Sequence, residues 1–175
     1  MGNIEAADPG KKVSKIGIAL LMLSVIVLFS TLGAAFMRSR QGEQVALPFL
    51  FYANTLILLI SSVLLHFSWK SEQLDVKKGL LSYSLLLGLA FLVSQTFAWG
   101  QLYAEGIDIA LSGQKASYLY VLTGLHALHV IGGNGFLAFV YFAFEKRGKD
   151  YFESAMFFWH FLGLLWVYLL CLLLV

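Results

Sequence analysis

Charged residues are scarce in this chain of 175 residues. Lys, Arg, Asp and Glu together make up 13% of it, whereas about 25% is usual in a soluble domain. Hydrophobic residues account for 59%. A water-soluble fold would have to expose many of them, because too few polar residues remain to cover its surface. The composition therefore excludes an ordinary soluble domain and indicates a protein that lies in lipid.

Cysteine is nearly absent, since Cys171 is the only one in the chain. An internal disulfide is therefore excluded, as is any zinc or iron–sulfur site built from cysteines. The net charge of +2 is spread over short loops, so a nucleic-acid surface has no support. The sequence also lacks a phosphate-binding loop and the GxSxG and HExxH motifs, which leaves no familiar hydrolase or metalloprotease site.

Long stretches without charge fill most of the chain. A helix needs about 20 apolar residues to cross the hydrocarbon core of a membrane. Five stretches reach this length, over residues 16–37, 46–67, 79–103, 118–144 and 156–175. They do not alternate in polarity as barrel strands do, and helices satisfy their own backbone groups in lipid. We therefore predict an all-α protein in which residues 16–175 form one domain, a bundle of five transmembrane helices, preceded by a flexible polar tail over residues 1–15.

Lys and Arg are unevenly divided between the two ends of the predicted helices. Nine lie in the N-terminal tail and in the second and fourth loops, against three on the opposite side. Positively charged segments favour the cytoplasmic side of a membrane. We therefore predict that the N-terminus faces the cytoplasm and that the C-terminus lies on the outer side.

No Asp, Glu, Lys or Arg lies inside any of the five stretches. Proton pumps and ion-coupled transporters normally need titratable groups within the bilayer, so this absence argues against a small transporter. Only histidine could supply such a group. His66 falls at the end of the second stretch and is interpreted as an interfacial residue.

The other three histidines allow two interpretations. His126 and His129 are three residues apart and share a face of the fourth helix, while His160 lies near the start of the fifth. They could be axial ligands of haem iron, which would make the chain a small membrane cytochrome. However, His160 is expected at a different depth from the pair, and no carboxylate is nearby to orient an imidazole. We therefore favour hydrogen bonding between helices.

Small and amide-bearing residues offer further packing positions within the stretches. Gly132 and Gly133 begin a small-residue patch on the fourth helix that would let another helix approach closely, either within the bundle or from a partner chain. Asn54, Thr55 and Gln95 can form hydrogen bonds between helices. The residues by themselves thus predict a bundle suited to packing, with no visible catalytic site.

Two motifs resemble those of a known membrane family. The segment LTGLHALHVIGG, residues 122–133, resembles the fourth-helix signature of subunit III of haem–copper oxidases. The segment FWHFLGLLWVY, residues 158–168, is similar to the last-helix motif of that family, in which Trp159, His160 and Trp166 match. Asn54 and Thr55 lie in a segment that resembles an earlier helix of the family. The resemblance covers residues 15–175 and fits the short, five-helix bacterial form.

This resemblance implies a non-catalytic subunit III of a respiratory terminal oxidase in a bacterial inner membrane. It implies a neighbouring catalytic subunit I that this chain stabilises, with haems and copper in the partner subunits and no cofactor here. Bound phospholipid and a larger respiratory supercomplex are further expectations. Cytochrome c oxidase of the aa3 type is the favoured assembly. A quinol oxidase or a nitric oxide reductase is the alternative.

The chain departs from the family pattern at three positions. Val25, Ala98 and Gly163 stand where the family usually has carboxylates, which argues against a proton-related role and leaves the packing role intact. We predict no catalytic or metal-binding residue. The residues predicted to serve helix packing, a subunit interface or a lipid cleft are Asn54, Thr55, Gln95, His126, His129, Gly132, Gly133, Trp159, His160 and Trp166.

Overall fold

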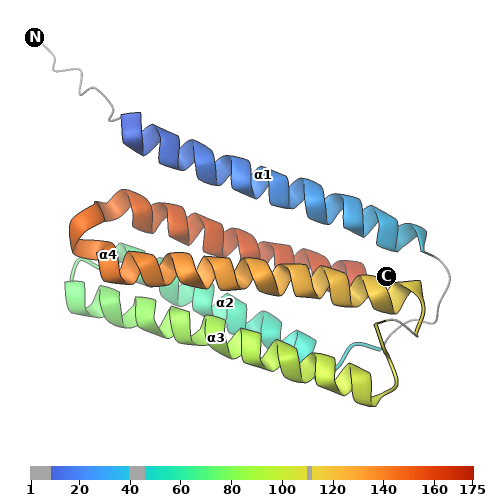
Figure 1. The fold of residues 1–175 in the computed structure, drawn as a ribbon. Helices are drawn as coiled ribbons and strands as arrows, with labels where there is room; N and C mark the ends of the chain where they lie inside the picture. Colours follow the sequence, from blue (N-terminus) through green and yellow to red (C-terminus); the bar gives the residue numbers. More distant parts are fainter. Residues whose placement is uncertain (1–8, 40–45, 110–111) are drawn as a thin grey trace, which may run out of the picture.

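The computed structural model describes residues 9–39, 46–109 and 112–175, with the side chains of 9–15 and 144–150 left out. Within these ranges the chain is helical and contains no strand (Figure 1). The helices are α1 (Pro9–Arg38), α2 (Phe49–Lys70), α3 (Leu74–Ala104) and α4 (Gln114–Leu173).

Helix α4 supplies two of the five spans. Its 60 residues form one continuous helical segment, but the ribbon reverses direction partway along, so that its two halves lie side by side (Figure 1). The first half covers Gln114–Ala143 and the second half Tyr151–Leu173. Together with α1, α2 and α3, five segments are long and apolar enough to cross a membrane. The predicted fold class, an all-α membrane protein with five spans, is confirmed.

The helix ends differ from the predicted limits by a few residues. Helix α1 already begins at Pro9, within the segment predicted to be a flexible tail, and residues 1–8 lie outside the described part. Helix α2 begins directly after Pro48, because proline lacks an N–H and is tolerated at a helix start. Helix α3 ends at Ala104, and Gly106 follows with a φ of 81°, which lets Ile107 N–H reach the carbonyl of Leu102 at 2.9 Å.

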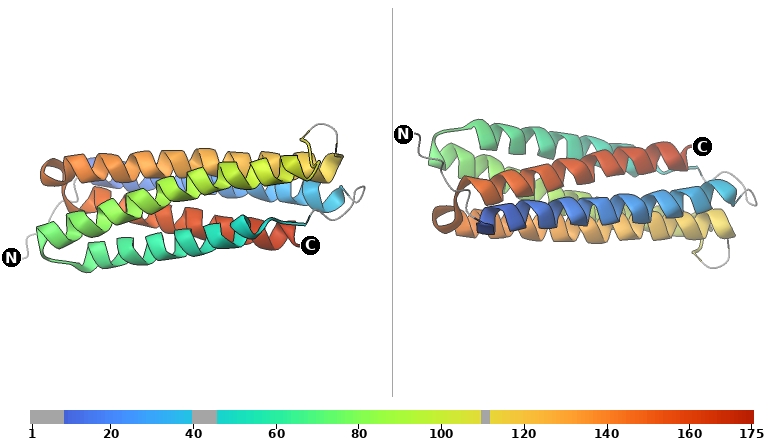
Figure 2. Two further views of the ribbon diagram at one scale, coloured as in Figure 1. Left: turned by 90° about the horizontal axis from the view of Figure 1, so that it is seen from below. Right: turned by 90° about the horizontal axis from the view of Figure 1, so that it is seen from above.

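The helices are arranged in three layers, with the two halves of α4 in the middle (Figure 1). Helices α2 and α3 pack against each other and against α4 on one side of it. Helix α1 lies on the other side, and in the described chain it packs against α4 but not against α2 or α3 (Figure 2). The second half of α4 is the most buried span and α1 the least. Helix α4 therefore forms the core on which the other helices assemble.

The segments that carry most of the positive charge gather at one end of this bundle. The start of α1, the junction of α2 with α3 and the reversal within α4 all lie at that end, opposite the C-terminus (Figure 1). Each span therefore runs in the direction opposite to the span before it, as successive membrane spans must.

Helices α2 and α3 meet along a seam with a regular repeat. Buried residues recur at alternating intervals of three and four along both helices. That spacing averages 3.5 residues, the period of left-handed coiled coils. The buried residues of α2 are Phe51, Asn54, Leu58, Ser61, Leu65 and Ser68. Those of α3 are Lys77, Leu81, Ser84, Gly88, Phe91, Gln95, Ala98 and Leu102.

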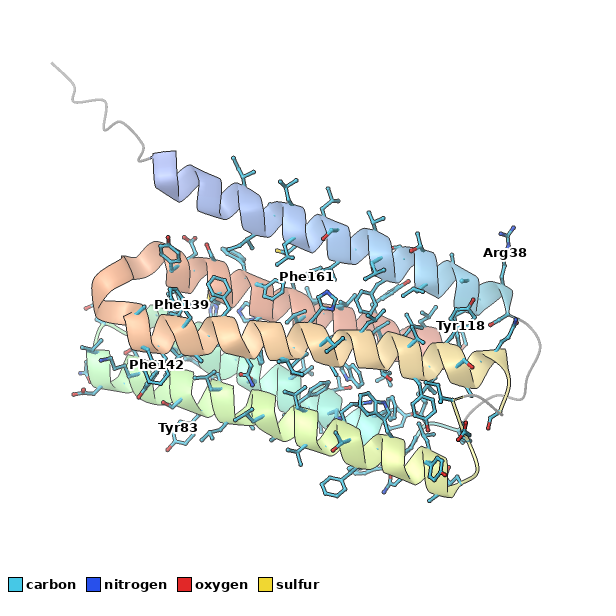
Figure 3. All side chains as sticks on the ribbon, viewed as in Figure 1. Arg38, Tyr83, Tyr118, Phe139, Phe142 and Phe161 are labelled. Carbon is cyan, nitrogen blue, oxygen red and sulfur yellow. The ribbon has the colours of Figure 1, made fainter. Side chains whose placement is uncertain are left out.

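Large apolar side chains cover the outside of the bundle. Phe142 is 84% exposed and Leu164 is 71% exposed, and Figure 3 shows Tyr83 projecting from α3 away from the other helices. Such a surface suits lipid tails, which are as apolar as leucine. The inside instead contains serine, glycine and amide residues next to its aromatic rings.

The seam predicts a contrast between two adjacent leucines. Leu58 is 3% exposed at the seam, whereas Leu59 is 49% exposed on the outside. Leu58→Ala should leave a cavity and lower the free energy of unfolding by about 2 kcal/mol or more. Leu59→Ala should change it little, because lipid fills the space. Detergent-induced unfolding of both variants measures the difference, and equal losses would contradict the seam.

Candidate helix-packing and interface site

Hydrogen bonds between side chains join α2 to α3 at three levels of the seam. Asn54 Nδ2 donates to Gln95 Oε1 at 2.9 Å. Ser61 and Ser84 each donate to the backbone carbonyl of the other, at 3.0 and 3.1 Å, and Ser68 Oγ donates to the carbonyl of residue 77 at 2.8 Å. On α2 these residues are seven apart, so all three bonds lie on one face. The structure thus brings two predicted residues, Asn54 and Gln95, into direct contact.

Two tryptophans of α4 bond to hydroxyl groups on α2. Trp166 Nε1 donates to Thr55 Oγ1 at 3.1 Å, and Trp159 Nε1 donates to Ser61 Oγ at 3.1 Å. Both indoles are almost completely buried. A buried indole N–H in lipid needs a partner of this kind. The tryptophans of the last-helix motif therefore fasten the second half of α4 to α2.

A third set of bonds joins α3 and the loop that follows it to the first half of α4, and the sequence analysis missed it. Trp99 Nε1 donates to Thr123 Oγ1 at 3.0 Å, and Tyr120 Oη donates to the carbonyl of Ile107 at 2.8 Å. A threonine or tyrosine in an apolar helix is common, so its type alone gives no signal. For the contact between α2 and α3 the sequence did offer a signal, because polar residues recur every seven positions along α2.

The two adjacent glycines of the predicted patch have different surroundings. A Cβ atom on Gly133 would lie 2.7 Å from Leu162 Cδ1 and 3.2 Å from Trp159 Cε3, so this glycine lets the halves of α4 pack closely. A Cβ on Gly132 would meet nothing within 4 Å, and Gly132 is exposed. Gly88 is a second close contact, because a Cβ there would lie 2.7 Å from Trp159 Cη2.

His126 and His129 face different neighbours. His126 is fully buried between Phe91 and Trp166, with ring centroids 5.7 and 5.1 Å away. His129 Nδ1 donates to the carbonyl of Leu125 at 2.7 Å, and its ring lies 5.7 Å from that of Phe29 on α1. The pair does not converge on one point, which disfavours a shared ligand.

His160 lies apart from the other predicted residues. Its ring centroid is 6.2 Å from that of His66 on α2, and both side chains are half-buried. His66 is also 6.2 Å from the ring of Trp69, near the end of α2. Across the described ranges no three or more His, Cys, Asp or Glu side chains are grouped as a metal ion would require.

An apolar groove of about 370 Å³ lies between α1 and α4. His129 and Gly132 are both in its lining, together with Ile18 and Leu21 of α1. His129 is the one polar side chain of that lining. The predicted residues therefore fall into three places: His129 and Gly132 in this groove, His160 beside His66, and the rest in the interior.

The three positions that lack the family's carboxylates all lie on packed faces. Val25 and Ala98 are buried, and a Cβ on Gly163 would lie 3.4 Å from Ser62 Oγ of α2. A carboxylate at Val25 or Ala98 would need a hydrogen-bonding partner inside the bundle. Apolar side chains remove that requirement here.

The adjacent glycines supply a matched pair of substitutions. Gly133→Leu should force Leu162 and the ring of Trp159 aside and lower the free energy of unfolding by about 1–3 kcal/mol. Gly132→Leu adds the same side chain toward open space, so it should leave stability unchanged or slightly raised through helix propensity. Detergent-induced unfolding compares the two. A loss of equal size in both variants would show that the contact at Gly133 is not the cause.

Comparison with known proteins identifies relatives of this chain. The family model for cytochrome c oxidase subunit III matches residues 6–175. A probable cytochrome c oxidase subunit 3 of Rickettsia conorii is 30% identical over 198 residues, which cover 93% of this chain and 67% of the relative. The cytochrome bo(3) ubiquinol oxidase subunit 3 of Pseudomonas putida is 28% identical over 157 residues, covering 85% and 75%.

A third relative gives a shorter match. The cytochrome c oxidase subunit 3 of Oncorhynchus mykiss is 34% identical over 124 residues, covering 66% of this chain and 46% of the relative. The family model covers nearly all of the present chain, including every span. The chain therefore belongs to the cytochrome c oxidase subunit III family.

Proposed function

We propose that this chain is a non-catalytic subunit III of a respiratory terminal oxidase, which packs against the catalytic subunit I and stabilises it. The observation that carries the proposal is that the polar groups in the interior hold the helices of the chain together. Amide, hydroxyl and indole groups on α2, α3 and α4 bond to each other across helix boundaries. A protein built in this way supplies a rigid apolar surface rather than a reaction centre. Membership of the family implies association with an oxidase complex.

The proposed neighbour would contact the lipid-facing surface. Helix α1 buries little of its surface within the chain, and Gly132 and Gly135 present exposed small-residue positions on α4. Small residues let a partner helix approach closely in lipid. Bound phospholipid is proposed beside the chain, and a larger respiratory supercomplex is proposed as the setting of the assembly.

We propose cytochrome c as the electron donor of the assembly and an aa3-type oxidase as its class. The similarity to the Rickettsia subunit supports this assignment. A quinol oxidase is the second candidate, supported by the similarity to the ubiquinol oxidase subunit of Pseudomonas putida. A nitric oxide reductase remains an alternative that no similarity reported above favours.

Haems and copper are proposed to lie in the partner subunits and not in this chain. The alternative, a small haem-binding cytochrome, would need His126 and His129 to serve as ligands. Their rings have different neighbours, since His129 lies beside Phe29 of α1 and His126 lies beside Trp166. The proposed membrane is the inner membrane of a bacterium, with the positively charged end of the bundle toward the cytoplasm.

Affinity purification of the tagged full-length chain tests the proposal. The chain should copurify with a larger subunit that shows haem absorbance, and the preparation should consume oxygen. Reduced cytochrome c and ubiquinol, supplied separately, then identify the donor. A chain that purifies alone, or that shows a reduced-minus-oxidised haem spectrum by itself, contradicts the proposal. In the second case, loss of the spectrum in His126→Ala or His129→Ala would establish the cytochrome.

A further inference from the structure

One cross-section of the bundle contains most of the buried polar atoms that have no hydrogen-bond partner. Six such side-chain atoms occur in the described part of the chain, on Asn54, Gln95, His126 and Asn134. The two on Asn134 lie against Gly88. The other four are Asn54 Oδ1, Gln95 Nε2 and both ring nitrogens of His126.

Contacts on either side place these four atoms at one level. The hydrogen bond from Trp99 to Thr123 and the close approach of Gly88 to Asn134 fix the register of antiparallel α3 and α4. That register puts His126 level with residue 96, next to Gln95. Asn54 lies at the same level, because its amide donates to Gln95 Oε1 at 2.9 Å.

Aromatic rings enclose His126 without satisfying it. Phe91 contacts it edge-on, and Phe91 has no polar atom to offer. Trp166 lies beside it, but the indole N–H is already donated to Thr55. Thus α2 is bonded to α3 and to the second half of α4 here, whereas the first half of α4 contributes a histidine with no bond.

The unpaired atoms require a ligand that both donates and accepts. Asn54 Oδ1 accepts, Gln95 Nε2 donates, and a neutral imidazole offers one donor and one acceptor nitrogen. Leaving such groups unpaired away from water carries the full cost of their desolvation. Water is the small molecule that matches this set, and buried waters typically make about three hydrogen bonds to such groups.

We propose that ordered internal water occupies this level of the bundle and bonds His126 to the Asn54–Gln95 pair. It links the first half of α4 to α2 and α3, and so completes a polar junction of four helical segments. The proposal concerns the chain itself and does not depend on the identity of the partner subunits.

Solid-state NMR of the full-length chain, labelled at histidine and leucine, in lipid bilayers tests the water directly. Magnetisation that starts on water should reach the ring nitrogens of His126 rapidly, although this side chain is fully buried. The methyl groups of Leu122, one turn away and equally buried, serve as the dry reference. Transfer to His126 that is as slow as transfer to Leu122 overturns the proposal.

A double-mutant cycle supplies an independent readout. If the site is dry, His126→Phe removes two unpaired atoms and should raise the thermal midpoint, and its effect should add to that of Gln95→Met. If water bridges the two, His126→Phe should lower the midpoint by about 2–4 °C, and Gln95→Met should cost less in its presence than alone.

The matched control is His129→Phe, because His129 Nδ1 bonds to the carbonyl of Leu125 within its own helix. Its effect should add to that of Gln95→Met. A raised midpoint for His126→Phe together with additivity would sink the proposal even if both variants fold well. The proposal is supported if His126→Phe and Gln95→Met are not additive while His129→Phe and Gln95→Met are.

Discussion

The structure depends on the need to pair every polar group inside a bundle that lipid surrounds. Helix α2 meets most of this need, because its face of Asn54, Ser61 and Ser68 bonds to α3. The same helix receives the indole N–H groups of Trp159 and Trp166. Each such bond is worth only about 0.6 kcal/mol on average in membrane proteins. Together they fix the register of three segments, since each can form only at one offset between helices.

Packing follows from the same constraint. Lipid tails solvate leucine as well as a protein interior does, so apolar burial does not by itself draw helices together. The bundle instead places glycine where close approach is needed, as at Gly133 against Trp159 and Leu162. Many other large aliphatic side chains, such as Leu59 and Leu164, face outward. Helix α1 is the exception, because it packs on α4 without a described side-chain hydrogen bond to it.

These features suit a subunit that supports another protein. The interior is occupied by bonds between its own helices, and the surface is broad, apolar and interrupted by exposed glycines. Val25 and Ala98, where the resemblance to the family leads us to expect carboxylates, are buried apolar groups. We interpret the result as a bundle that holds its shape within the membrane.

The sequence alone determined that the chain is helical, that it has five spans and which residues are candidates for packing. Runs of about 20 uncharged residues permit no other spanning structure, and the two motifs identified the family. Only the tertiary structure decided that Gly133 is packed while Gly132 is open, that His126 and His129 face apart, and that Trp99 bonds to Thr123. In helices that are apolar on every side, hydrophobicity does not mark the inward face. That face is set by the offset and rotation at which small and polar groups on different helices meet.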